Sequence, residues 1–380
     1  MNFTKISQYL DSLEEMGIPS VDCIIYKDHE QVYRHMNGTV DEKRTVPVTE
    51  KQQYLMFSMT KIQTMTAIMQ LVEKGLISLE DEVGDYLPAY KNLMVKETID
   101  GKEVVRPAKT PLKLKYLLSM QSGLDYDLER PGIKRVLQEK GMKATTRELV
   151  DAFVESPLLF DPGTRFNYSL SHDVAAAIIE VVAGMSFSEY LKKNIWEPLK
   201  MTRTFFAKPM NDNVENLAKQ FIYNDPDGSI TPMESSCCYQ LSDCYESGGA
   251  GLISCTEDYS LLGEALANGG ISKDGVRILN PETIEIIKEN LLGEESLKDI
   301  ANNMGRPQYG YGCGMQVFMK PELSNSPAPV GVFGWDGAAG SCLIMDTKNK
   351  VSLTFTMHVR GCGPAYGVIH PKLRDMLFED

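Results

Sequence analysis

The chain has 380 residues, of which 43% are hydrophobic and 24% are charged, enough to bury one large core or two closely packed ones. Its formal net charge is −13, and it has no run rich in lysine and arginine. Nucleic acid and anionic membrane are therefore excluded as expected partners, because both bind to a basic surface.

Residues 1–20 carry several charges and lack the apolar core of a secretory signal, and no apolar run in the chain reaches the length of a membrane span. The eight cysteines are scattered, and Cys237, Cys238 and Cys244 lack the paired spacing of a zinc site. We therefore expect a cytoplasmic protein with reduced cysteines and with no metal or other cofactor.

Simple patterns predict the elements of the first hundred residues. An amphipathic helix is expected over about 4–16, followed by two short β-rich runs, 21–27 and 31–38, joined by a turn at Asp28-His29. Residues 54–74, YLMFSMTKIQTMTAIMQLVEK, predict a helix that is apolar nearly all round and therefore buried. Asp100-Gly101 between two alternating runs predicts a hairpin.

Helices are expected next, and strands after them. Residues 112–200 have a largely helical pattern, and 171–184, SHDVAAAIIEVVAG, ends at a glycine that is typical of a helix C-cap. In SCTED, the spacing of Ser254 and Glu257 predicts a capping box. Beyond about residue 310 short β-rich runs are separated by turn residues, and a closing helix is expected after Pro364.

Strands thus lie at both ends of the chain, with helices between them. The simplest assembly is an α+β fold with one antiparallel sheet built from both ends, flanked by helices, and a mostly helical region inserted. We expect a single unit over 1–380, with a sheet subdomain from about 1–85 and 245–380 and a helical subdomain over about 86–244.

Two polar residues open the apolar segment 54–74. Ser58 and Lys61 are three positions apart, so on a helix they lie on one face, one turn apart. Desolvation lowers the pKa of a lysine, and a neutral amine can take the proton of a serine hydroxyl. The free N–H groups at a helix start also favour a developing anion. The pair is a candidate nucleophile and base, although such a tetrad also occurs by chance.

Two further stretches are candidates to complete the site. In DPGTRFNYSLSHDV, Tyr168 precedes a helix, and a tyrosine beside an ammonium group can have a lowered pKa and pass protons. In FGWDGAAGS, residues 333–341, small residues let a strand approach a ligand, and an N–H there could form an oxyanion hole with that of Ser58. A packed tyrosine and a plain glycine turn are the structural alternatives.

The order of these motifs resembles the serine β-lactamase and penicillin-binding protein superfamily, in which Ser-x-x-Lys is a signature. Supporting stretches from 57–88, 114–124, 168–184 and 247–270 are similar to the class C branch. The resemblance implies a β-lactamase/transpeptidase-like fold with Ser58 as the acylated nucleophile and Lys61 and Tyr168 as its base and acid. It also implies that Gly337 lies in the oxyanion strand, and that the N–H groups of Ala338 and Ser58 are the donors.

Two positions depart from the β-lactamase pattern. Leu170 stands where lactamases have the Asn of Tyr-x-Asn, and Trp335-Asp336-Gly337 replaces Lys-Thr-Gly. A leucine cannot bind a substrate amide, the cation for a lactam carboxylate is missing from the motif, and Asp336 would repel one. These motifs are similar instead to those of the family VIII carboxylesterases and related acyltransferases.

We therefore expect a serine hydrolase that acts through an acyl-enzyme, as a carboxylesterase or acyltransferase on small uncharged esters, with Leu170 and Trp335 as an apolar wall. A small-molecule ester or amide is the expected substrate. The first alternative is a weak β-lactamase or D-amino-acid peptidase of the same superfamily. The second is a catalytically silent binding protein on this fold.

Overall fold

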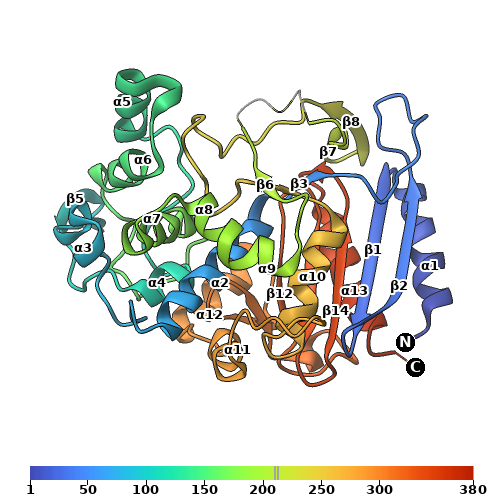
Figure 1. Ribbon diagram of the computed structural model, residues 1–380. Coiled ribbons are helices and arrows are strands. Elements are labelled where there is room, and N and C mark those ends of the chain that lie inside the picture. The colour runs from blue at the N-terminus through green and yellow to red at the C-terminus, as the bar shows by residue number, and fades with distance from the viewer. Residues whose placement is uncertain (209–210, 212–213, 380) are drawn as a thin grey trace.

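The computed structural model describes residues 1–208, 211 and 214–379. Its largest element is a seven-stranded antiparallel sheet in the order β10-β11-β12-β13-β14-β1-β2. These strands are β1 Ser20–Lys27, β2 Glu30–Gly38, β10 Tyr309–Tyr311, β11 Gln316–Phe318, β12 Phe333–Asp336, β13 Cys342–Asp346 and β14 Val351–Thr356. Because β1 pairs with β14, the two ends of the chain meet in one sheet, and both termini lie near its edge (Figure 1).

Alternating side chains give the sheet two apolar faces. Val21, Cys23 and Ile25 of β1 pack in one cluster with helix α1 (Phe3–Ser12) and helix α13 (His370–Met376). On the opposite face, Leu343 and Met345 pack with helix α10 (Thr256–Ala267) and the helical region. A strand side chain alternates between faces with a period of two, so helices on both faces bury every position of β13 and β14.

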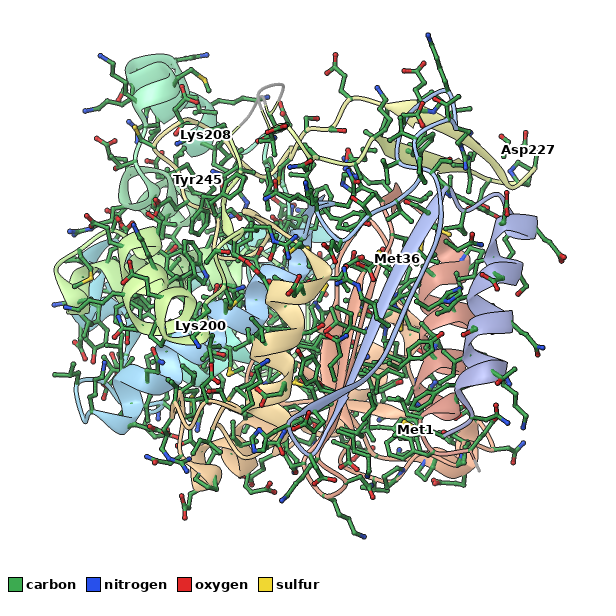
Figure 2. All side chains as sticks on the ribbon, turned by 45° about the vertical axis from the view of Figure 1, so that its right-hand side comes forward. Met1, Met36, Lys200, Lys208, Asp227 and Tyr245 are labelled. Carbon is green, nitrogen blue, oxygen red and sulfur yellow. The ribbon has the colours of Figure 1, made fainter. Side chains whose placement is uncertain are left out.

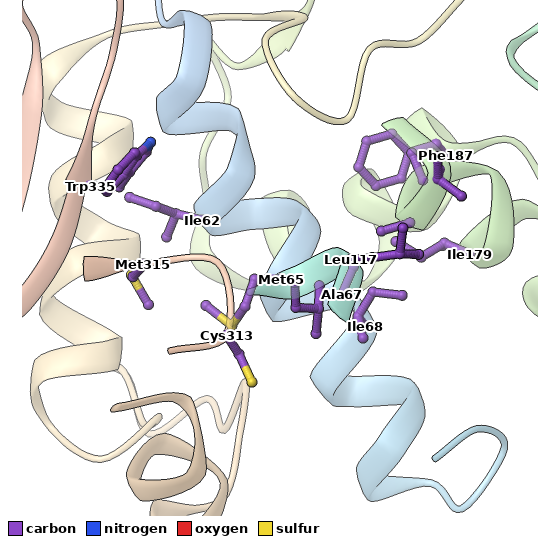
Figure 3. Packing of buried hydrophobic residues seen from close by; sticks show 14 of the residues in the cluster. Ile62, Met65, Ala67, Ile68, Leu117, Ile179, Phe187, Cys313, Met315 and Trp335 are labelled. Atoms are coloured by element: carbon purple, nitrogen blue, oxygen red, sulfur yellow. The ribbon is translucent and has the colours of Figure 1, made fainter. Parts of the chain in front are cut away.

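Helix α2 (Thr60–Glu73) joins the sheet to the helical region, and every residue from Thr60 to Leu71 is buried. Figure 3 shows it between Trp335 on one side and Phe187 and Ile179 on the other. Burying each large aliphatic side chain contributes about 1.5–3 kcal/mol. The other helices are α3 Val83–Tyr86, α4 Leu114–Leu118, α5 Pro131–Lys140, α6 Thr146–Ala152, α7 Ser171–Ala183, α8 Phe187–Leu191, α9 Glu197–Leu199, α11 Pro281–Lys288 and α12 Glu294–Met304.

The described residues also form three small sheets. They have the strand orders β3-β9-β6, β15-β7-β8 and β4-β5. Their strands are β3 Tyr54–Leu55, β4 Met94–Ile99, β5 Lys102–Pro107, β6 Phe205–Phe206, β7 Gln220–Asn224, β8 Ser229–Met233, β9 Leu252–Ser254 and β15 Val359–Arg360. The first of these sheets lies next to the segment that contains Ser58, because β3 ends three residues before Ser58.

The expected α+β class and the antiparallel sheet built from both chain ends are confirmed. The predicted capping box is wrong: the N-cap of α10 is Cys255, while the Ser254 hydroxyl pairs with that of Thr204 at 2.6 Å. The segment expected to form a helical subdomain, about 86–244, contains helices α4 to α9 between residues 114 and 199, strands β4 and β5 before them, and strands β6, β7 and β8 after them.

No described helix is by itself long and apolar enough to cross a membrane. Ser171–Ala183 and Phe187–Leu199 would reach that length together, but they bend by 76° at their junction. Side chains that end in nitrogen or oxygen project from the outside of the molecule, as Figure 2 shows.

Candidate active site

Ser58 lies in a single 3-10 turn, Phe57–Met59, directly before α2. The Met56 N–H donates to Leu252 O at 2.9 Å, which ties this turn to β9. Phe57 has a left-handed backbone with φ of 46° and is fully buried, a conformation that costs a non-glycine residue about 1–3 kcal/mol. The buried neighbours hold that strained turn, and Ser58 remains partly exposed at a helix start.

Lys61 is completely buried and is held by three oxygen atoms. Its Nζ lies 3.1 Å from Ser58 Oγ, 2.8 Å from the Tyr126 hydroxyl and 2.7 Å from Gly249 O. Burial lowers the pKa of Lys61 to about 7, against the opposing charges of Asp173 and Asp336. The predicted proximity of Ser58 and Lys61 is therefore present, and the neutral amine is accessible near physiological pH.

Asp173, to which the sequence analysis gave no role, lies near Lys61. Its Oδ1 accepts hydrogen bonds from Tyr245 at 2.7 Å and Ser247 at 2.6 Å. A Cβ on Gly249 would lie 2.6 Å from Asp173 Oδ2 and 3.5 Å from Lys61 Nζ, so only glycine fits between the two charged groups. Burial raises the pKa of Asp173, and Lys61, Tyr245 and Ser247 counteract it.

Tyr168 lies beside the lysine, as expected, but its protonation differs from the prediction. Lys61 Nζ is 4.7 Å from the centroid of its ring, and Trp335 Nε1 donates to its hydroxyl at 2.9 Å. Burial raises the pKa of Tyr168, and hydrogen bonds from Ser58 and Trp335 only partly offset this. Tyr168 is therefore a protonated phenol that can donate, and Lys61 is the better base.

Tyr126 is a second phenol that the motifs did not indicate. Its hydroxyl is closer to Lys61 Nζ than the Ser58 hydroxyl is, and its ring centroid lies 5.5 Å from that of Tyr168. Tyr239 continues this aromatic row at 5.4 Å from Tyr126. No motif signals Tyr126, because its position depends on how the loop after α4 packs over the site.

The glycine-rich segment approaches the nucleophile from the sheet. The Gly337 N–H donates to Ser341 O at 2.8 Å and is used within the strand pairing, whereas the next N–H, that of Ala338, has no acceptor among the residues described. The Ser58 N–H belongs to the first helical turn, where N–H groups have no partner within the helix. These two N–H groups remain our candidates for the oxyanion hole.

The expected substrate-binding side chains are placed differently. Leu170 is 2% exposed and packs in the main core, so it cannot form an apolar wall with Trp335, which is also buried and lies under Tyr168. Asp336 is not an isolated anion, because its Oδ2 binds Arg306 Nη2 at 2.6 Å. That ion pair neutralises the repulsion expected from the sequence, and Arg306 stacks 4.9 Å from the Trp335 ring.

Together these groups provide a nucleophile, a buried amine with a low pKa, a phenol that donates and candidate anion-binding N–H groups. Among the described residues, no three His, Cys, Asp or Glu side chains form a group able to hold a metal ion. The chemistry that this arrangement supports is attack of Ser58 on a carbonyl carbon.

The pKa of Lys61 makes the reactivity of Ser58 depend on pH. Only the unprotonated amine can accept the serine proton, so the rate of fluorophosphonate labelling should rise about tenfold per pH unit below about 6.5 and level off above about 7.5. Intact-mass measurement of labelling from pH 5 to 9 checks this. A flat profile would contradict it, and Lys61→Arg, which stays protonated, should be slow throughout.

Gly337 offers a steric test of the oxyanion strand. A Cβ at this position would lie 2.3 Å from Met56 O, so Gly337→Ala must push the strand away from the turn that carries Ser58. Overpacking of this kind costs about 1–3 kcal/mol, and loss of one oxyanion donor costs about a hundredfold or more in rate. We expect labelling to slow by at least about tenfold.

The matched control is Gly363→Ala, because a Cβ there meets nothing within 4 Å. Thermal unfolding and labelling rate are measured on both variants. If Gly337→Ala were labelled as fast as wild type, the proposal that this strand forms part of the site would be wrong.

The chain is similar to known proteins in both sequence and fold. The Beta-lactamase family model matches residues 6–365. The acyltransferase mokF of Monascus pilosus is 29% identical over 69% of this chain and 63% of its own length. A putative D-alanyl-D-alanine carboxypeptidase of Escherichia coli (strain K12) is 26% identical over 99% of this chain and 85% of its own.

Two solved structures share the fold over nearly their whole length. EstCE1, a hydrolase with promiscuous acyltransferase activity, has a TM-score of 0.78 at 24% identity and covers 99% of this chain and 98% of its own. A mutant of simvastatin synthase (LovD) from Aspergillus terreus has a TM-score of 0.79 at 20% identity and covers 99% and 96%. With the family model spanning almost every element described above, the chain belongs to the Beta-lactamase family.

Proposed function

We propose that this protein is a serine hydrolase that acts through an acyl-enzyme, as a carboxylesterase or acyltransferase on small esters. One observation carries the proposal: the fully buried Lys61 amine, with a pKa of about 7, lies 3.1 Å from the Ser58 hydroxyl at the start of α2. A lysine buried only for packing would not need a partly exposed serine as one of its partners.

In this proposal each of these groups takes one step of the proton transfer. Ser58 Oγ attacks the ester carbonyl while Lys61 takes its proton, and the N–H groups of Ser58 and Ala338 stabilise the oxyanion. The C–O bond to the leaving alcohol then breaks, and the Tyr168 hydroxyl gives that oxygen a proton and recovers one from Lys61. Water or a second alcohol or amine releases the acyl group from Ser58 by the reverse path.

The relatives support transfer as well as hydrolysis. Two are named as acyltransferases, mokF and calJ, and EstCE1 is described as a hydrolase with promiscuous acyltransferase activity. The partner in our proposal is a small-molecule ester or amide. All eight cysteines carry free thiols, which supports a cytoplasmic location.

A weak β-lactamase or D-amino-acid peptidase is the second candidate, supported by the similarity to a putative D-alanyl-D-alanine carboxypeptidase. Against it, the amide and the cation of the lactamase motifs are replaced by the buried Leu170 and Trp335. A silent binding protein has no reason to keep Ser58, Lys61 and Tyr168 together with Lys61 desolvated.

Removal of the nucleophile tests the proposal directly. Ser58→Ala should lose covalent fluorophosphonate labelling, and its ester turnover should fall by up to about 10^6. Ser324→Ala, at an exposed serine, is the control and should label like wild type. Intact-mass spectrometry and p-nitrophenyl butyrate hydrolysis give the two readouts, and equal labelling of Ser58→Ala and wild type would refute the mechanism.

Substrate class is tested by comparing the turnover of two substrates, an ester and a β-lactam. Loss of the motif cation removes a charge-assisted hydrogen bond, which weakens lactam acylation about tenfold to a hundredfold. We expect hydrolysis of p-nitrophenyl esters from acetate to butyrate and little or no turnover of nitrocefin. The measurement is kcat/KM for both on one preparation, and a tenfold advantage for nitrocefin would favour the lactamase alternative.

A further inference from the structure

Arg360 places an unbalanced positive charge beside the candidate site. It ends β15, and the N–H of the preceding Val359 donates to Ala339 O at 3.0 Å, next to the candidate oxyanion residue Ala338. Its guanidinium carbon lies 5.3 Å from the ring centroid of Phe57, the residue before the nucleophile. The turn that carries Ser58 and the glycine-rich segment at Ala339 therefore both contact the end of β15 that carries this arginine.

No carboxylate neutralises this charge within the part of the chain that the structure describes. Arg306, by contrast, binds Asp336 directly, and Arg106 binds Asp161 at 2.7 Å. The charge of Arg360 acts to lower the pKa values of the Tyr239 phenol, the buried Cys237 thiol and His358, none of which is a carboxylate. Burial lowers the pKa of His358 to about 4, so that ring carries no charge at neutral pH.

The aromatic row relates Arg360 to the reacting atoms. The Phe57 ring lies edge-on to Tyr239 at 6.3 Å, Tyr239 lies beside Tyr126, and Tyr126 lies beside Tyr168. Tyr168 protonates the leaving alcohol at one end of this row. Arg360 lies at the other end, over the ring of Phe57, the residue before the nucleophile.

We propose that Arg360 binds a carboxylate on the acyl part of the substrate, a few bonds from the reacting carbonyl. This inference rests on the proposed function and narrows its substrate class. The motifs predicted an uncharged substrate because their own cation is replaced by Trp335, but Arg360 lies outside the motifs. In a protein with a net charge of −13, a local cation is what lets an anionic ligand approach.

The kinetic test uses two esters that differ by one charge: mono-4-nitrophenyl adipate and its methyl ester. Wild type should favour the carboxylate by about tenfold in kcat/KM, the range of one charge-assisted hydrogen bond. Arg360→Gln should bring the ratio of the two kcat/KM values close to one, and Arg360→Lys should retain part of the preference. Because the ratio is compared between variants, the intrinsic reactivity of each ester cancels.

Arg135→Gln is the matched control, since Arg135 is exposed on α5 and, among the described residues, pairs with Glu139 and Glu155 alone. It should keep the wild-type ratio. A ratio that is unchanged in Arg360→Gln, or a wild-type enzyme without preference for the carboxylate, overturns the proposal.

A binding experiment separates this inference from the catalytic one. Calorimetry is carried out on Ser58→Ala, which lacks the nucleophile and cannot hydrolyse an ester. It compares the binding affinity of monobenzyl adipate with that of benzyl methyl adipate. Tighter binding of the acid that disappears in Ser58→Ala/Arg360→Gln supports the carboxylate site even if ester hydrolysis fails. Equal binding of the two esters to Ser58→Ala rejects it even if hydrolysis succeeds.

Discussion

The desolvation of one amine is the constraint on which the site depends. An ammonium group buried without full compensation loses hydration worth several kcal/mol, so Lys61 is tolerated only where the neutral form is accessible and each N–H has an acceptor. Those acceptors come from three separate segments, at Ser58, Tyr126 and Gly249. The sheet, α2 and the loops of the helical region must all be in place before the base has its working pKa.

The residues that replace the lactamase cation form a connected unit. Asp336 holds Arg306, the guanidinium stacks on Trp335, and the indole N–H donates to Tyr168. The lysine of the usual motif would bring a mobile charge to this place. Here the neutral indole N–H of Trp335 donates to the Tyr168 hydroxyl. The positive charge belongs to Arg306, which is buried in an ion pair with Asp336. Tyr168 therefore keeps its proton, which suits a group that must donate to a leaving alcohol.

Much of this architecture follows from local patterns. The buried helix after Ser58, the hairpin at Asp28-His29 and the strands at both ends were all legible, because apolar periodicity and turn residues act over short distances. The Ser58–Lys61 contact was predictable because helical geometry fixes residues three apart. Tyr126 and Arg360 were not, since each reaches the site through a tertiary contact that no spacing encodes. Leu170 failed as a substrate residue for a related reason: motif position does not reveal which way a side chain packs.

The pairing of β1 with β14 has a consequence for how the chain is made. Asp22 on β1 lies opposite Thr356, more than three hundred residues later, and no intermediate strand can take that place in the sheet order. A ribosome therefore releases the β1–β2 hairpin with an open hydrogen-bonding edge and an uncovered apolar face long before its neighbour exists. Contacts between such distant residues slow folding and leave strand edges exposed to other chains. We therefore expect this edge of the first strands to stay unpaired until the last strands have been synthesised.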